Sequence, residues 1–138
     1  MANKGAIQFN TDIQKWIKKA NGNTERFLQE FCSDIGEAIV MQTPWITGFL
    51  RGSWTGMRNK IDLNYKGRPD KDGVFAITTI SLAAAQMKSG DVFYITNNAN
   101  YALHVEFGTY KMAPRAMVRG VFAQADNIAE QVIARLPK

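Results

Sequence analysis

Apolar residues recur at helical spacing in two long segments of the chain. Between residues 24 and 42 they return every three or four positions, which predicts a helix that ends before Pro44. Between residues 114 and 136 a broader apolar stripe predicts a second long helix, which Pro137 ends. We therefore expect a long helix on either side of the central part of the chain.

The central part is richer in β-branched and aromatic residues, with partial alternation of apolar and polar positions. These features predict three strands, over residues 53–61, 74–82 and 92–96, and the second of them, VFAITTISL, has the clearest pattern. After the third strand the helical spacing returns and predicts a short helix over residues 101–108. A further helix is expected at residues 11–20, before the first long one.

Helices segregated from a run of neighbouring strands indicate an α+β fold, with an antiparallel β-sheet packed against the long N-terminal and C-terminal helices. The length of 138 residues fits a single domain over residues 1–138. Two polar stretches that contain glycine, residues 59–73 and 87–91, are expected to be loops.

The composition narrows the class of protein only a little. Apolar residues make up 46% and charged residues 21%, which excludes a disordered chain. A single cysteine, Cys32, excludes an internal disulfide framework and a zinc site built from cysteines. The net charge of +5 permits contact with nucleic acid without identifying it. No apolar run approaches the ~18 residues of a membrane span, so we expect a protein made in the cytoplasm.

Few residues could carry catalysis. His104 is the single histidine, and no serine or cysteine lies near it in the sequence, so it is expected at a surface or an interface. Cys32 falls on the apolar face of the predicted helix at residues 24–42, which is typical of a structural thiol. No glycine-rich phosphate loop is present. The sequence therefore predicts neither an enzyme nor a cofactor or metal site.

Glu106 is the carboxylate with the most unusual surroundings, because both of its neighbours in the sequence are apolar. A carboxylate held in such a place needs hydrogen bonds or a charged partner. Arg51, Arg115 and Arg119 are the candidates for this partner. The alternative is an exposed glutamate at the end of a helix.

Basic residues gather in two places. One group lies between residues 58 and 71, where aspartates interrupt it, and the other consists of Lys111, Arg115 and Arg119. A solvated or subunit-facing surface is favoured over a nucleic-acid site, because the sequence contains no recognisable DNA- or RNA-binding module.

Two motifs stand out beyond these patterns. The first is TPWITGFLRGSW at residues 43–54, and the second is NNANYALHVEFGTYKMAPRAMVRGVF at residues 97–122. In this order and at this separation they resemble the neck or tail-completion family of tailed bacteriophages, whose members are minor tail components. The matching positions are Thr43, Pro44, Thr47, Gly48, Leu50, Arg51, Trp54, Tyr101, Ala102, Glu106, Phe107, Gly108, Thr109, Ala113, Pro114 and Arg119. The chain departs from the family at Trp45 and Ile46, where a Val-Asp pair is frequent, and at Ala116, where a second proline is frequent.

The resemblance implies a structural protein of the virion, assembled in the host cytoplasm. It implies a homo-oligomeric ring, with six copies as the expected number, that joins head to tail around the DNA passage and performs no catalysis. Neighbouring connector and tail proteins would be its partners, and the mild positive charge is compatible with non-specific contact with DNA. Trp45, Phe49 and Trp54 suit contacts between subunits. The candidate interface or motif residues are Trp45, Phe49, Arg51, Trp54, Tyr101, Glu106, Gly108, Lys111, Pro114, Arg115 and Arg119.

Two other functions remain open at this point. One is a tail terminator, another ring of the same junction that caps the tail tube. The other is a small basic nucleic-acid-binding protein. An enzyme is the least favoured class.

Overall fold

The fold is given by a computed structural model that describes residues 14–20, 22–45, 47–65 and 67–137. Residues 14–19 are helical, and residues 11–13 of the helix expected there lie outside the described residues. The elements that follow are α2 (Thr24–Gln42), α3 (Phe49–Gly52), β1 (Trp54–Arg58), α4 (Val74–Ala84), β2 (Phe93–Asn97), α5 (Ala102–Phe107), α6 (Met117–Phe122) and α7 (Ala125–Arg135).

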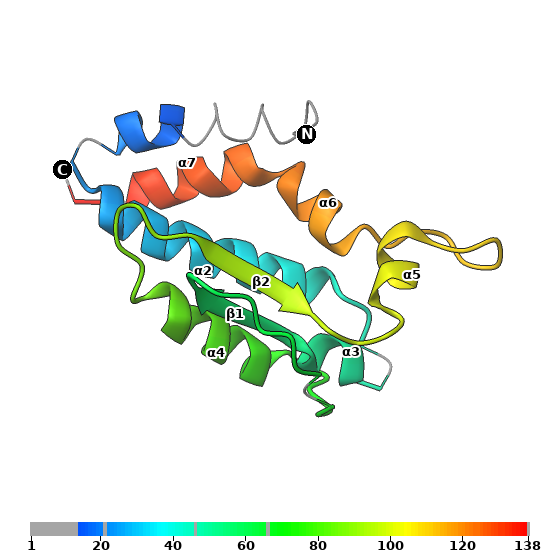
Figure 1. Cartoon of the computed structure of the whole chain (residues 1–138). Helices are drawn as coiled ribbons and strands as arrows, with labels where there is room; N and C mark the ends of the chain where they lie inside the picture. Colours follow the sequence, from blue (N-terminus) through cyan, green and yellow to red (C-terminus); the bar gives the residue numbers. More distant parts are fainter. Residues whose placement is uncertain (1–13, 21, 46, 66, 138) are drawn as a thin grey trace.

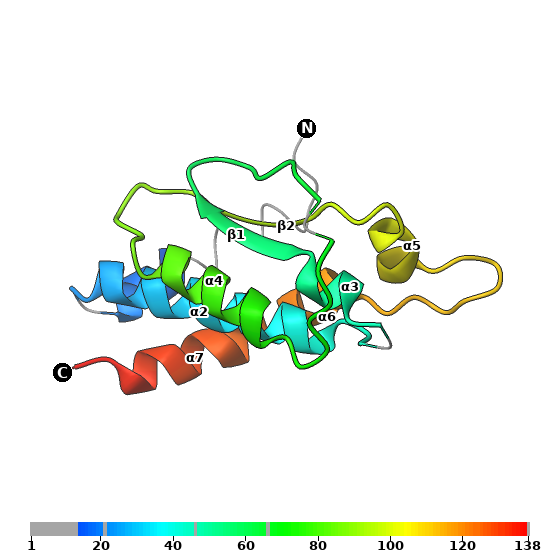
Figure 2. The ribbon, with the colours of Figure 1, turned by 90° about the horizontal axis from the view of Figure 1, so that it is seen from below.

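These elements form three layers (Figures 1 and 2). The two strands make a short antiparallel sheet on one side, with Trp54 opposite Asn97 and Arg58 opposite Phe93. Helices α2 and α4 lie side by side against the sheet, and α6 and α7 pack on the other side of α2 (Figure 2). The α+β class and the antiparallel sheet predicted from the sequence are therefore confirmed.

Helix α2 lies at the centre of the core. Its buried residues are Phe27, Phe31, Ile35, Gly36, Ile39 and Val40. They fall three or four positions apart, apart from two adjacent pairs, as the apolar pattern predicts. Gly36 allows α4 to approach closely, because a Cβ atom at this position would lie 2.4 Å from Cγ2 of Ile80.

The strand predicted at residues 74–82 is wrong, since this segment forms helix α4. Its β-branched residues favour a strand locally. The buried residues Ala76, Ile80 and Ala84, however, lie four positions apart, which places them on one face of a helix against α2 and the sheet. Packing of that face outweighs the local preference.

Two aspartates also stabilise the start of α4. Asp70 is buried and accepts hydrogen bonds from the backbone amides of Phe75 at 3.3 Å and Ala76 at 2.9 Å. Asp72 accepts a bond from the amide of Val74 at 3.2 Å. These carboxylates accept hydrogen bonds from amide groups that have no partner within the helix. Their negative charge is also favourable at the positive end of the helix dipole.

The single helix predicted over residues 114–136 is also wrong, because the segment forms two helices. Ala116 has a left-handed backbone conformation with φ of 47°, and α6 begins after it. A turn at residues 123–124 then separates α6 from α7, and the amide of Gln124 donates to the carbonyl of Val121 at 2.9 Å. The buried apolar stripe continues across this turn, so the sequence pattern does not reveal it.

Most of the remaining elements agree with the sequence predictions. Helix α2 has the predicted bounds, and β2 and α5 lie within one residue of theirs. Strand β1 lies inside its predicted segment but ends three residues earlier, at Arg58, and the short helix α3 was not predicted. Residues 87–91 contain neither helix nor strand, and the same holds for the described part of 59–73. None of the helices in the described ranges is long and apolar enough to cross a membrane.

Candidate functional site

A buried carboxylate in the second motif holds two helices together. Glu106 lies near the end of α5 and is 7% exposed. Its carboxylate accepts hydrogen bonds from the backbone amides of Val118 at 2.9 Å and Arg119 at 3.1 Å. It also accepts a bond from Nε of Arg119 at 2.9 Å. Of the three arginines considered as partners, Arg119 therefore fills that role, with a side chain that is itself largely exposed.

The backbone reinforces the contact between α5 and α6. The amide of Arg115 donates to the carbonyl of Val105 at 2.8 Å, and the amide of Ala116 donates to the carbonyl of Glu106 at 3.2 Å. The guanidinium of Arg119 donates to the same Glu106 carbonyl. The last carbonyls of α5 and the first amides of α6 thus find partners in each other's segment, which is a requirement at helix ends.

The charge of Glu106 is maintained by these bonds. Burial alone raises the pKa of the carboxyl group, but the amides of Val118 and Arg119 and the Arg119 side chain lower it by more. The pKa therefore lies below its ordinary value of 4.5. At neutral pH, Glu106 is a charged structural group rather than an acid or base poised to exchange a proton.

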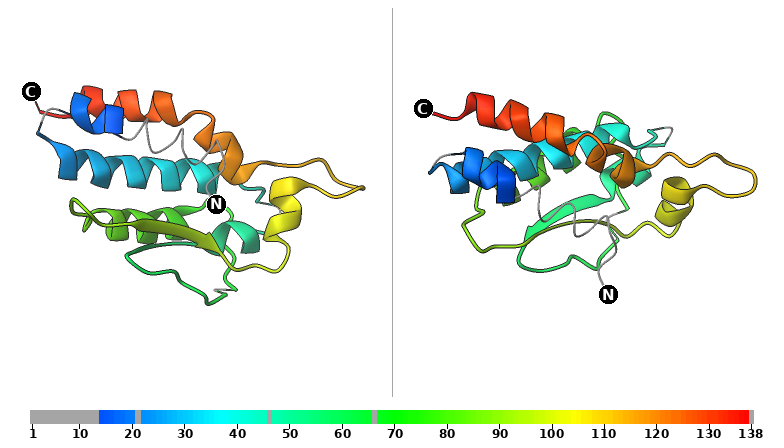
Figure 3. Two further views of the ribbon diagram at one scale, coloured as in Figure 1. Left: turned by 45° about the horizontal axis from the view of Figure 1, so that its top comes forward. Right: turned by 90° about the horizontal axis from the view of Figure 1, so that it is seen from above.

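Residues 107–116, which we name the tip, protrude from the body of the molecule beside α5 (Figures 1 and 3). Gly108, directly after the end of α5, has φ of 80°, and a Cβ atom there would lie 2.7 Å from the backbone nitrogen of Pro114. Only glycine therefore allows the two arms of the tip to approach at this point. At the outer end, Tyr110 is 94% exposed.

The tip carries apolar and basic side chains and no carboxylate. Its exposed residues include Phe107, Tyr110, Lys111, Met112, Pro114 and Arg115. The Lys111 ammonium group lies 5.4 Å from the centre of the Tyr110 ring, within the range of a cation–π contact. Aromatic residues, methionine and arginine are enriched where proteins bind each other. The tip has the composition of a binding element.

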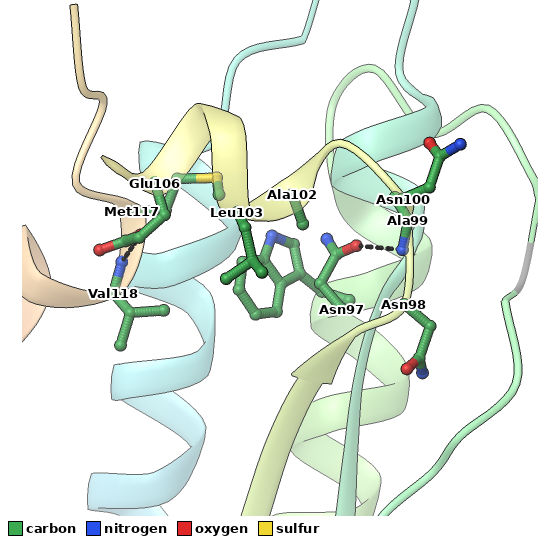
Figure 4. Close-up of a pocket in the computed structure, with 10 residues that line it drawn as sticks. Asn97, Asn98, Ala99, Asn100, Ala102, Leu103, Glu106, Met117 and Val118 are labelled. Carbon is green, nitrogen blue, oxygen red and sulfur yellow. Dashed lines mark hydrogen bonds between the residues drawn. The ribbon is translucent and has the colours of Figure 1, made fainter. Parts of the chain in front are cut away.

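A hollow of about 370 Å³ lies beside Glu106, between α5, α6 and the end of β2 (Figure 4). Its lining is mostly apolar and includes Trp54, Ala102, Leu103 and Met117. Among the described residues that line it, Glu106 is the one that is ionisable, and its carboxylate already accepts hydrogen bonds from α6. The hollow therefore presents no acid, base or nucleophile free to act on a substrate.

Arg51, in the first motif, is buried and bonds to backbone carbonyls. Its Nε donates to the carbonyls of Val40 and Thr43, each at 3.1 Å. Its Nη2 donates to the carbonyl of Met41 at 3.1 Å, and its Nη1 donates to that of Lys71. Arg51 thus donates hydrogen bonds to the last carbonyls of α2 and connects them to the loop before α4. It is not the partner of the buried carboxylate in the second motif.

The aromatic residues of the first motif have different surroundings. The sequence places Trp54 among the contacts between subunits, but this residue is buried in the core of the chain. Its Nε1 donates to the Thr43 hydroxyl at 2.8 Å, which in turn donates to the carbonyl of Ile39 at 2.7 Å. Trp45 and Phe49 are exposed. These two remain available to another molecule, whereas Trp54 is not.

The other candidate residues give no sign of catalysis. His104 is exposed, as expected from the sequence, and Tyr101, directly before α5, is exposed as well. Cys32 is partly buried, and burial raises the pKa of its thiol to about 12, so the thiol is protonated at neutral pH. Within the part of the chain that the structure describes, no group of three or more His, Cys, Asp or Glu residues could hold a metal ion.

The sequence prediction missed one surface, the outer face of α4. This helix contains no charged residue and most of its residues are apolar, a composition typical of a largely buried helix. Yet Val74, Phe75 and Leu82 are exposed. The run of apolar residues was visible in the sequence, but a helix must be assumed before its outer face can be recognised.

Comparisons of the chain with protein-family models, with curated proteins and with solved structures found no match. Its function must therefore be inferred from its own motifs and geometry.

Proposed function

We propose that this chain is a structural subunit of the connection between head and tail of a tailed bacteriophage, where copies of it form a ring around the DNA passage. The observation that carries the proposal is the arrangement at the second motif. Glu106 uses its charge to fasten α5 to α6. The tip beside this contact presents apolar and basic side chains to solvent, with Tyr110 at its outer end. Such a surface suits binding to another protein.

The roles of the motif residues support the same proposal. Four residues that carry the resemblance to the neck family, Arg51, Glu106, Gly108 and Arg119, each position backbone at a helix end or in the tip. Part of the resemblance thus involves residues with structural roles in this fold, while other matching positions, such as Thr47 and Thr109, are exposed. None of the four is arranged to act on a substrate.

The proposal is tested by removing the gene from the phage that carries it and imaging the products by electron microscopy. We expect DNA-filled heads and tails of normal length that are not joined. Wild-type protein supplied from a plasmid should restore infectious particles.

Two other outcomes favour the alternatives. Tails of irregular length in the absence of the chain would identify a tail terminator instead. Normal, infectious particles without the chain would contradict both assembly functions. Tight binding of duplex DNA by a monomer, with a steep dependence on salt, would then favour a nucleic-acid-binding protein.

A further inference from the structure

Two exposed apolar surfaces lie on different parts of the molecule. One is the tip. The other is the outer face of α4 together with the adjoining side of α2, which we name the α2–α4 face. The tip points away from α4 in both views, so the two surfaces do not meet within one chain (Figures 1 and 2). Each therefore needs a cover from another molecule if its apolar residues are to be buried.

The apolar half of the α2–α4 face comes from α4. Phe75 and Leu82 lie along the outside of the helix with the polar Thr78 between them, and Leu82 is 64% exposed. The guanidinium of Arg68 lies 4.0 Å from the centre of the Phe75 ring and covers part of it. The rest of this strip has no cover within the described part of the chain.

The acidic half of the face comes from α2. This helix carries four carboxylates and one arginine, which gives it a net charge of −3, while α4 has no charge. Glu30 and Asp34 share Arg135 as an ion-pair partner, and Glu30 also pairs with Arg26 on α2. Glu37 is exposed and has no ion pair among the described residues.

The two halves adjoin each other directly. The hydroxyl oxygens of Ser33 on α2 and Ser81 on α4 lie 2.8 Å apart. The groove at this junction has a volume of about 530 Å³, and its lining includes Glu30 and Asp34 together with their partners Arg26 and Arg135. The apolar strip of α4 thus runs beside a charged row on α2, in which Glu37 has no arginine partner among the described residues.

The tip has the complementary chemistry. It offers Phe107, Tyr110 and Met112 as apolar groups, and Lys111 and Arg115 as exposed cations without an ion pair among the described residues. Complementary charges of this kind steer association and fix its orientation.

We infer that the tip of one copy docks on the α2–α4 face of the next copy. Tyr110 and Met112 lie against the apolar strip of α4, and Lys111 and Arg115 face Glu37 and the neighbouring carboxylates of α2. The contact joins two different surfaces, so copies that repeat it head to tail, each with a different neighbour on either side, form a ring or a filament. This inference rests on the proposed function, because it supplies the interface that such a ring requires.

The hollow beside α5 is a poorer acceptor for the tip. Its one carboxylate, Glu106, is already paired with Arg119, whose guanidinium also lies 4.4 Å from the centre of the Phe107 ring. A second cationic tip would find no free carboxylate there, whereas the α2–α4 face offers Glu37.

The inference is tested by disulfide cross-linking between two populations of the full chain, both carrying Cys32→Ala. One population carries Tyr110→Cys and the other carries Leu82→Cys. A matched control replaces the second by Asn127→Cys, which lies at an exposed position on α7. We expect the Tyr110→Cys and Leu82→Cys populations to give several times more mixed dimer than the control pair. A yield equal to that of the control overturns the inference.

A charge exchange provides a second readout on the same cross-link. Glu37→Lys in the Leu82→Cys population should lower the yield, and Lys111→Glu in the Tyr110→Cys population should restore it. Positions 37, 82, 110 and 111 are exposed, so each variant should keep the melting temperature of its Cys32→Ala parent. An equal yield with and without the charge changes would overturn the assigned orientation.

The test separates this inference from the proposed function. If cross-linking fails but the chain still forms a ring in phage particles, the interface is wrong and the proposed function stands. If cross-linking succeeds but removal of the chain leaves particles normal, the interface stands and the proposed function is wrong.

Discussion

Arg51 and Glu106 perform opposite tasks at the ends of two helices. Arg51 donates to the last carbonyls of α2, whereas Glu106 accepts from the first amides of α6. In each case the side chain has the charge that the helix dipole favours at that end. Their surroundings differ. Arg51 is enclosed by backbone carbonyls, whereas Glu106 forms an ion pair with Arg119, whose side chain is half-exposed.

The difference indicates what each site stabilises. Arg51 links the end of α2 to Lys71 in the loop before α4, so it connects elements inside the core. Glu106 fixes α5 to α6 at the base of the tip. A change at Arg51 should therefore weaken the whole fold, whereas a change at Glu106 should act mainly on the part of the chain proposed to bind a neighbour.

Replacement of Arg51 should have the largest effect. Arg51→Met keeps much of the side-chain volume but removes a donor from four carbonyl groups, of which that of Val40 keeps the amide of Thr43, and we expect a loss of about 3 kcal/mol in the free energy of unfolding. Arg51→Lys keeps the charge but cannot reproduce the fork of donors, so its loss should be intermediate. Urea denaturation measures both. Equal, small losses for the two variants would show that Arg51 is not a central connection.

Replacement of Glu106 should have the next largest effect. Glu106→Ala leaves the amides of Val118 and Arg119 without their acceptor, and we expect a loss of roughly 2 kcal/mol. Arg119→Ala should cost less, because the carboxylate still receives both amides. Hydrogen exchange should show faster exchange in α5, the tip and α6 than in α2. An unchanged melting temperature for Glu106→Ala would remove its structural role.

The start of α4 offers a third helix end for the comparison, with a carboxylate but no arginine. Asp70→Ala removes the acceptor for two amides and should cost about 1 kcal/mol, as the loss of a helix cap does. The matched variant Asp72→Ala removes the acceptor for one exposed amide and should cost less. Thermal unfolding of the two variants measures the difference. If Asp72→Ala costs more, the account of how α4 begins is wrong.

The smallest effect should be the pH dependence at Glu106. Its pKa in the folded chain lies below the ordinary value of 4.5 expected in the unfolded chain. Its contribution is therefore fully present above that ordinary value and is lost as the pH falls through the folded-state pKa. The difference in stability between wild type and Glu106→Gln should shrink between neutral and acid pH. A difference that stays constant down to pH values well below the ordinary pKa would contradict this assignment.

Sequence patterns predicted the parts of the fold in which local preference and tertiary packing agree. Helix α2 follows directly from its apolar spacing and from Pro44. The sequence also singled out Glu106 as a carboxylate that needs a partner, and it offered Arg119 among three candidates. It could not choose between them, because the choice depends on the turn at Ala116, where φ is 47°.

The predictions from sequence were wrong where local preference and tertiary packing favour different structures. Residues 74–82 prefer a strand locally, and the helix is favoured by packing against Gly36 and by the carboxylate of Asp70. Trp54 was grouped with Trp45 because both are aromatic and close in sequence. Only the fold shows that Trp54 is inside and Trp45 outside.

Cryo-electron microscopy of phage particles that contain this chain tests the central claim most directly. The account predicts a ring of copies at the junction between head and tail, into which the fold described here fits, with the tip of each copy against α4 of its neighbour. Particles whose junction contains no copy of this chain would contradict it.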